Sequence, residues 1–241
     1  MRDTMAVFIV DDSTSQLEAA LSIVTPSLIL PRLRTETRHE HDAVEQVLDL
    51  MSATLTREGY RHRLEQFYGF YAPLEAALKD SGERLAHKAG KAGEPDTLLG
   101  TRAALASRLN KTVLLEHDLH HLGVATDNIP LCRHLPPFET HAEILGCLYV
   151  MEGATLGGRI ITQHVRATLG ITPATGGNFF DGYGDDTGKM WQGMRQLLLD
   201  SASDTETENT IVSTAVATFA CLRRWCQSSQ QGIPTETTRH A

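Results

Sequence analysis

The stretch Leu145-Gly-Cys-Leu-Tyr-Val-Met-Glu-Gly-Ala-Thr-Leu-Gly-Gly-Arg-Ile-Ile161 decides the predicted fold. Its apolar spacing predicts a buried helix, yet glycines interrupt it, and each one costs a helix about 0.5–1 kcal/mol relative to alanine. At roughly 100° per residue, Gly146, Gly153 and Gly157 fall on one line of the helix surface. Two interpretations are open at this point. Either another helix packs closely through the Gly153-x-x-x-Gly157 pattern, or a flat ligand approaches the backbone more closely than a Cβ allows.

The composition is typical of a globular protein, with 241 residues of which 41% are hydrophobic and 22% charged. A formal net charge of −8 argues against general affinity for nucleic acid or an anionic membrane. The cysteines show no C-x-x-C spacing and Cys147 lies in the apolar helix, so we expect a reduced, cytoplasmic protein. No apolar run approaches the roughly 18 residues that span a bilayer, so we expect no membrane insertion.

The first 30 residues differ from the rest of the chain. Residues 6–13, Ala-Val-Phe-Ile-Val-Asp-Asp-Ser, predict a short buried strand that resembles the first strand of a response-regulator receiver domain. Too few residues follow before the next element to build that fold. We therefore expect an unassigned N-terminal extension over 1–30, a helical domain over 31–230 and a polar tail over 231–241.

From Leu33 onward, apolar residues recur at helical spacing. Pro73 is expected to bend or divide the second helix. No strand-like alternation follows residue 30, so the predicted class is all-α. The expected helices cover 33–55, 60–78, 97–122, 138–169, 189–199 and 205–227, and Gly170 ends the fourth of them.

His41 is the leading candidate for a metal ligand. It shares an apolar helix face with Val44, where a histidine is more often a buried structural residue than a ligand. Glu45, four residues on, lies within reach of the ring. If Glu45 accepts the Nδ1 proton, Nε2 is free to bind a metal. A single axial histidine suits a haem, and Arg34 and Arg38 can reach haem propionates.

Other histidines are weaker candidates. His117, His120 and His121 have, with Asp118, a spacing that suits zinc or a di-metal site, although a polar helix face is the commoner interpretation. His164 continues the glycine line two turns further on. A second axial histidine would leave no position for dioxygen, so His164 ranks below the first candidate.

Several linked motifs resemble one known family. Leu33-Arg-Thr-Glu-Thr-Arg-His-Glu-His-Asp-Ala-Val-Glu45 resembles the proximal helix of haem oxygenases, with its Thr-x-x-x-His element at Thr37 and His41. The segments 68–75 and 149–158 resemble the bacterial, biliverdin-producing branch often found alongside bacteriophytochromes. The resemblance covers roughly residues 30–228 and includes Phe179, Phe180, Tyr183, Gly184 and Trp191.

This resemblance implies one all-α domain with haem between a proximal and a distal helix. Carried over by position, His41 is the axial iron ligand and Glu45 its hydrogen-bond partner. Gly153 and Gly157 are then the distal glycines, which face the bound dioxygen. The other haem contacts that the resemblance implies are Arg34, Tyr149, Gly158, Phe180, Lys189 and Arg195.

One position departs from the family pattern. Many members carry an aspartate just after the first distal glycine, where it organises water near bound dioxygen. In this chain that position is Ala154. Either other groups replace the aspartate, or turnover is impaired.

The resemblance implies oxidative cleavage of haem, which is both cofactor and substrate, to biliverdin, carbon monoxide and ferrous iron with dioxygen. The sequence has no flavin or iron–sulfur motif, so electrons come from an external donor, a ferredoxin- or flavodoxin-type reductase. A bacteriophytochrome is the implied recipient of the biliverdin. Two alternatives remain: a haem-binding carrier or sensor without turnover, and a non-haem metallo-enzyme on a similar helical fold.

Overall fold

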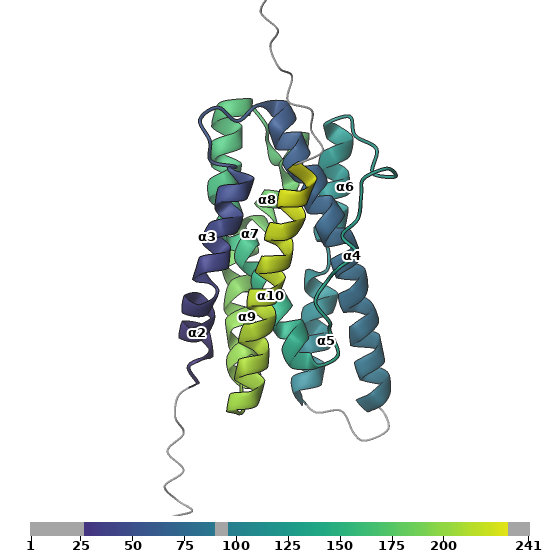
Figure 1. The fold of residues 1–241 in the computed structure, drawn as a ribbon, viewed down its shortest axis with the longest axis vertical. Coiled ribbons are helices and arrows are strands. Elements are labelled where there is room, and N and C mark those ends of the chain that lie inside the picture. Colours follow the sequence, from purple (N-terminus) through teal and green to yellow (C-terminus); the bar gives the residue numbers. More distant parts are fainter. Residues whose placement is uncertain (1–26, 90–95, 231–241) are drawn as a thin grey trace, which may run out of the picture.

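The computed structural model describes residues 27–89 and 96–230, and within these ranges it contains helices and no strand (Figure 1). The predicted all-α class is therefore confirmed. The predicted strand at 6–13 and the predicted tail at 231–241 lie outside the described residues. In chain order the elements are α2 (Ile29–Glu36), α3 (Arg38–Leu48), α4 (Arg57–Ala89), α5 (Asp96–Arg108), α6 (Lys111–His121), α7 (His141–Leu169), the short turn η1 (Pro173–Thr175), α8 (Asn178–Asp181), the short turn η2 (Gly184–Asp186), α9 (Thr187–Ser201) and α10 (Thr205–Gln230).

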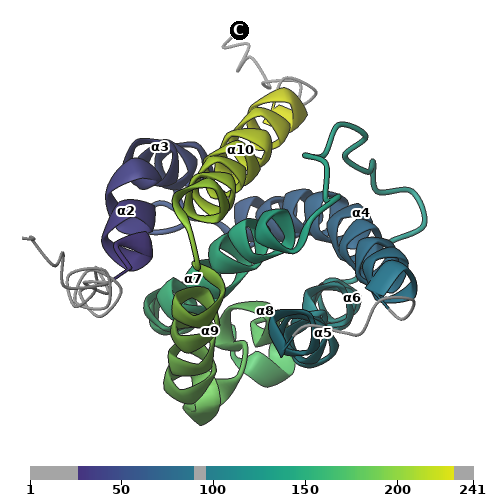
Figure 2. The ribbon, with the colours of Figure 1, turned by 90° about the horizontal axis from the view of Figure 1, so that it is seen from below.

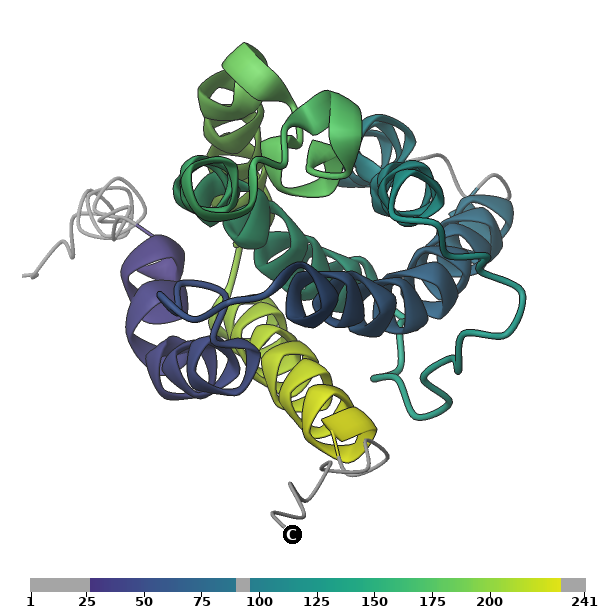
Figure 3. The ribbon, with the colours of Figure 1, turned by 90° about the horizontal axis from the view of Figure 1, so that it is seen from above.

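The glycine-rich helix α7 is the centre of the fold. Its first turn is fixed by a capping box, in which Thr140 Oγ1 accepts from the Glu143 N–H (3.2 Å) and the Glu143 carboxylate accepts from the Thr140 N–H (2.8 Å). The helix ends as predicted at Gly170, whose φ of 67° favours glycine. Figures 2 and 3 show α7 between α10 on one side and α8 and α9 on the other, and these are its main packing partners.

By length and composition, α7 is the one described helix apolar enough to cross a membrane. We did not expect this from the sequence, because polar residues interrupt every apolar run. Of its most apolar 18-residue window, 56% is buried inside the fold. Burial against neighbouring helices is typical of a core helix and explains the composition without a bilayer.

Several predicted helix bounds differ from those in the structure, where α3 ends at Leu48 and α4 runs from Arg57 to Ala89. Pro73 lies inside α4 and does not divide it, because a buried apolar stripe continues on both sides of the proline. The predicted helix at 97–122 is two helices, α5 and α6. The Glu75 carboxylate accepts from the backbone N–H groups of Lys111 (2.7 Å) and Thr112 (3.1 Å), and so caps the start of α6 from another helix. The stripe of α4 consists of Tyr60, Leu64, Phe67, Tyr71, Leu74 and Leu78.

The N-terminal helical region begins at Ile29, slightly before the predicted boundary at residue 31, and is broken at Thr37. The buried Thr37 hydroxyl donates to the Leu33 carbonyl at 2.6 Å, where α2 ends. Arg34 therefore lies on α2, whereas His41 lies on α3. Both helices pack against α10.

Candidate functional site

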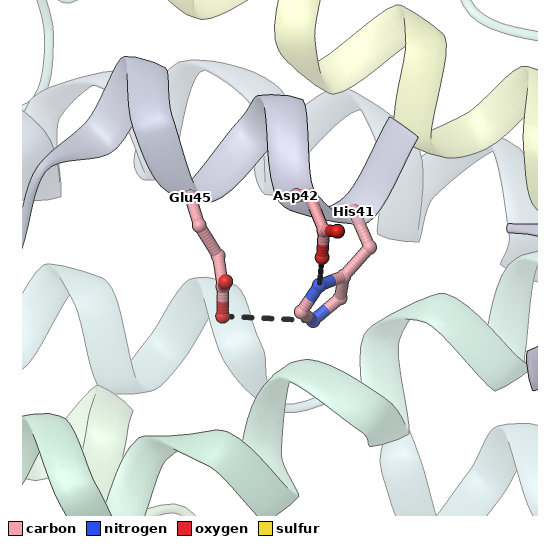
Figure 4. Close-up of side chains that lie close together, drawn as sticks. All are labelled: His41, Asp42 and Glu45. Atoms are coloured by element: carbon pink, nitrogen blue, oxygen red, sulfur yellow. Dashed lines mark hydrogen bonds and ion pairs between the residues drawn. The ribbon is translucent and has the colours of Figure 1, made fainter. Parts of the chain in front are cut away.

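His41 and Glu45 project from the same side of α3, with Asp42 beside them (Figure 4). The ring atom Nε2 of His41 lies 3.8 Å from Glu45 Oε1, and Nδ1 lies 3.4 Å from Asp42 Oδ1. The prediction placed Glu45 at Nδ1, whereas in the structure Glu45 lies beside Nε2. The short Asp42 side chain lies beside Nδ1 instead. When Nδ1 carries the proton it donates to Asp42, which leaves Nε2 free as a ligand. Asp42 is thus a site residue that the sequence analysis missed.

The ring of His41 is not buried in the core. Its side chain is 48% exposed, although Val44 and Leu48 on the same helix are buried. One edge of the ring contacts Phe219 of α10, with ring centroids 5.6 Å apart. The interpretation of His41 as an ordinary core histidine therefore does not describe this side chain. It is held on one side by α10 and is accessible on the other.

The glycine line of α7 divides into two parts. A Cβ at Gly146 would meet the Ile211 carbonyl oxygen and lie 2.9 Å from Thr214 Cβ, so this glycine allows close packing against α10. A Cβ at Gly153 or Gly157 would meet no atom within 4 Å. These two glycines face open space, and they lie on the same line of one helix. The packing interpretation holds for the first glycine and fails for the other two.

Two contacts join the α3 region to α7 on either side of this open space. At one end, Thr37 lies close enough to the Tyr149 hydroxyl to lower its pKa. At the other, His164 Nε2 donates to the Ser52 carbonyl oxygen at 3.1 Å. The two contacts are the same distance apart in sequence on both segments, from 37 to 52 and from 149 to 164. His164 is thereby engaged in a structural hydrogen bond, which fits its low rank as a ligand.

Along the two segments, His41 and Glu45 of α3 and the open glycine positions Gly153 and Gly157 of α7 fall between the residues that make these contacts. α3 packs against α10 and makes little direct contact with α7. The arrangement fits a planar ligand, because a histidine nitrogen is available, two glycines leave room above the backbone, and α10 supports the ring. Apolar side chains on the same stretch of α7 are exposed, namely Leu156 at 43% and Ile160 at 63%.

Tyr149 and Arg34 lie together at the Thr37 end. Burial raises the pKa of Tyr149, while the hydrogen bond with Thr37 and the positive charge of Arg34 lower it. The Tyr149 ring also packs on Trp191 of α9, with centroids 5.8 Å apart. A cation and a phenol at one end of the open space are suited to bind carboxylates.

The structure shows other contacts for four residues that the resemblance linked to haem. A Cβ at Gly158 would meet the Phe180 carbonyl oxygen, so Gly158 serves the packing of α8. Phe180 is 4% exposed and its ring packs among Tyr60, Phe67 and Phe179. The other two, Lys189 and Arg195, line a cavity that His41, Tyr149 and the open glycines do not line. Ala154, on the exposed side of α7, brings no polar side-chain atom.

The rival histidine cluster on α6 is arranged differently from a closed metal site. Asp118 is fully buried and accepts from the backbone N–H groups of Asn178 (2.9 Å) and Phe179 (2.7 Å), so its carboxylate anchors α8. The His121 ring nitrogen Nδ1 donates to the His117 carbonyl at 2.9 Å. A closed metal site needs at least three ligand atoms close together. Within the described residues one such group occurs, with donor atoms within 4.8 Å of one another, and it consists of His41, Asp42 and Glu45 rather than residues of α6.

A buried group of charges beside α7 was not predicted. Glu152 is 2% exposed, accepts from the Tyr183 hydroxyl at 2.7 Å and lies 3.4 Å from Arg108 Nε. Lys111 is 1% exposed, and its Nζ lies 4.3 Å from the centre of the Tyr183 ring. Burial lowers the pKa of Lys111, whereas the nearby Glu152 and Glu75 raise it. A glutamate inside the apolar run of α7 was the one sequence signal for this cluster.

Comparison with known proteins identifies the family. The family model described as Heme oxygenase matches residues 28–228. The fold resembles the NO- and CO-bound heme oxygenase of Neisseria meningitidis (20% identity, TM-score 0.63, covering 83% of this chain and 91% of that one). It also resembles Synechocystis heme oxygenase-2 in complex with heme and NO (19% identity, TM-score 0.62, 85% and 86%). A third similar structure is the Leptospira interrogans heme oxygenase (18% identity, TM-score 0.60, 84% and 100%).

No sequence among the curated proteins matches this chain. The solved structures agree with it in fold, and the family model spans most of its length. The chain belongs to the heme oxygenase family.

Proposed function

We propose that this protein binds haem between α3 and α7 and cleaves it oxidatively, with His41 as the axial ligand of the iron. The observation that carries the proposal is the pair of open glycines, Gly153 and Gly157, on the stretch of α7 between Tyr149 and His164, whose side chains lie next to Thr37 and Ser52. A glycine inside a helix costs about 0.5–1 kcal/mol relative to alanine, so two glycines at positions where an alanine would fit suggest that a ligand uses the space above them. When bound, haem supplies both the iron that activates dioxygen and the ring that is cleaved.

The chain's own residues position the ligand. His41 Nε2 would hold the haem iron, and Asp42, which accepts from Nδ1 when that nitrogen carries the proton, would favour that tautomer. Gly153 and Gly157 leave space for dioxygen close to the helix backbone. Arg34 and Tyr149, at one end of the site, bind propionates and fix the rotation of the ring. Fixed rotation determines which edge of the ring lies next to the reacting oxygen.

The proposed products are biliverdin, carbon monoxide and ferrous iron. We further propose that a ferredoxin- or flavodoxin-type reductase supplies the electrons, that a bacteriophytochrome receives the biliverdin and that the protein acts in the cytoplasm. We also propose that residues 31–230 form the catalytic domain. The products and the phytochrome partner rest on the resemblance of the segments 68–75 and 149–158 to the phytochrome-associated branch, the cytoplasmic location on the cysteine pattern, and the domain bounds on the helical pattern after residue 30.

The test is aerobic incubation of the haem-loaded protein with a chemical reductant. The Soret band is expected to disappear while a red-absorbing bilin grows and carbon monoxide is released, and chromatography of the product identifies the isomer. A Soret band that persists would contradict turnover and favour a haem carrier or sensor in which Ala154 has abolished the reaction. Metal analysis of the haem-free protein tests the non-haem alternative, which requires a bound transition metal.

A further inference from the structure

Two histidines at the end of α6 are not used by the proposed haem site. His117 and His121 are both exposed and lie one helical turn apart, with ring centroids 4.2 Å from each other. α6 and α3 lie on opposite sides of the bundle, so this pair is far from the helix that carries His41 (Figures 1 and 2). Two imidazole rings this close on one exposed helix face can bind the same ion.

The neighbours of each ring determine which nitrogen faces solvent as a ligand. His121 Nδ1 lies 2.9 Å from the His117 carbonyl oxygen, which can only accept, so this Nδ1 carries the proton. His117 Nδ1 lies 3.4 Å from Asp118 Oδ1. That carboxylate is itself fixed, because it accepts from the backbone N–H groups of Asn178 and Phe179. Both rings therefore favour Nε2 as the unprotonated nitrogen, and a carbonyl or carboxylate behind Nδ1 is the usual support of a metal-binding histidine.

The pair forms an open chelate rather than a closed metal site. Asp118 is buried and anchors α8, so it supports the His117 ring and does not act as a ligand. In the part of the chain that the structure describes, no third ligand-type side chain completes a group with these two histidines. The protein therefore supplies two ligands, and water fills the remaining positions around an ion.

The surroundings of the pair favour a cation. α6 ends at His121, so both rings lie at the negative end of the helix dipole. Between residues 112 and 132 the sequence has three acids, Glu116, Asp118 and Asp127, and no lysine or arginine. Imidazole nitrogen suits late first-row transition metals, whereas calcium and magnesium prefer oxygen ligands. The donor set thus selects the class of metal.

We propose that His117 and His121 chelate a divalent ion of the nickel, copper and zinc class through their two Nε2 atoms. Each nitrogen lies about 2.0–2.1 Å from such an ion, so the two Nε2 atoms must come within roughly 3–3.5 Å of each other. Rings whose centroids are already 4.2 Å apart reach that spacing with small torsional changes. The site is separate from the haem iron, so the proposal does not rest on haem degradation.

The test is calorimetric titration of the haem-free full-length chain with zinc chloride, after a chelator has been added and dialysed away. Saturable binding is expected. His117→Ala and His121→Ala should each weaken it at least about tenfold, because the second nitrogen then no longer binds within the same molecule. Electron paramagnetic resonance of the copper-loaded chain should show coupling to two imidazole nitrogens, and to one fewer in each variant.

Two control variants separate this pair from other histidines. His87→Ala removes an exposed histidine of α4 and should bind zinc as the unmodified chain does. His41→Ala removes the histidine that lies with Asp42 and Glu45, the competing group of ligand atoms, and should leave the α6 site intact. The proposal is overturned if zinc gives no saturable signal, if the two α6 variants bind as the unmodified chain does, or if either control loses as much affinity as they do. Circular dichroism confirms that each variant is folded.

Discussion

Replacing Gly157 by alanine is expected to stabilise the haem-free protein and to slow haem degradation. The added Cβ meets no atom within 4 Å, so alanine gains its normal helix preference without a clash. The expected gain in the free energy of unfolding is about 0.5–1 kcal/mol. In the haem-loaded protein the same methyl group occupies the space assigned to dioxygen, so the rate of haem loss should fall. Urea unfolding and the initial rate of Soret decay measure the two effects.

Gly146→Ala is the matched control on the same helix. Its Cβ would meet the Ile211 carbonyl oxygen and Thr214, which belong to the backbone and core of α10 and cannot move aside cheaply. Overpacking of this kind costs about 1–3 kcal/mol. The two alanine variants should therefore change stability in opposite directions. If Gly157→Ala destabilised the haem-free protein as much as Gly146→Ala, the claim that a side chain fits at Gly157 without a clash would be contradicted.

Glu152→Gln is expected to lower the free energy of unfolding by about 3–5 kcal/mol, the usual cost of removing one partner from a buried ion pair. Glutamine has nearly the same shape and can still accept from the Tyr183 hydroxyl, so the change removes mainly the charge. Arg108 would then lose its carboxylate partner, and Lys111 would keep only Glu75. Chemical denaturation of the haem-free protein measures the loss.

The control for this variant is Glu83→Gln, which makes the same chemical change at an exposed position of α4. A surface substitution of this type should stay within about 0.5 kcal/mol of the unmodified chain. Equal stabilities for the two variants would show that the buried charges beside α7 contribute nothing to the fold.

The features that could be predicted from sequence are those determined locally. The apolar period of α7, its capping box at Thr140 and its terminal Gly170 are encoded within a few residues of one another, and the predicted helix agrees with the structure there. The α5–α6 boundary could not be predicted, because the Glu75 carboxylate that caps α6 comes from α4. Local pattern also led us to expect that Pro73 bends or divides its helix, and tertiary packing keeps that helix undivided.

In the candidate site, too, local spacing was predictable from the sequence and tertiary contacts were not. The spacing of Gly153 and Gly157 indicated a shared face, but only the fold shows that this face is open while Gly146 is packed. Lys189 and Arg195, which the resemblance groups with the haem contacts, line a cavity along α9 with Arg108, an arrangement that sequence spacing did not indicate. Asp42 was missed because sequence spacing gives no preference between the two ring nitrogens of His41.

The most direct test of the account is a haemin titration of His41→Ala beside the unmodified chain and His164→Ala. We predict that His41→Ala loses the Soret band of the histidine-ligated complex and that added imidazole restores it. His164→Ala should keep the band, because His164 hydrogen-bonds to Ser52. A His41→Ala variant with an unchanged Soret band and unchanged haem affinity would contradict the central claim that His41 is the axial ligand.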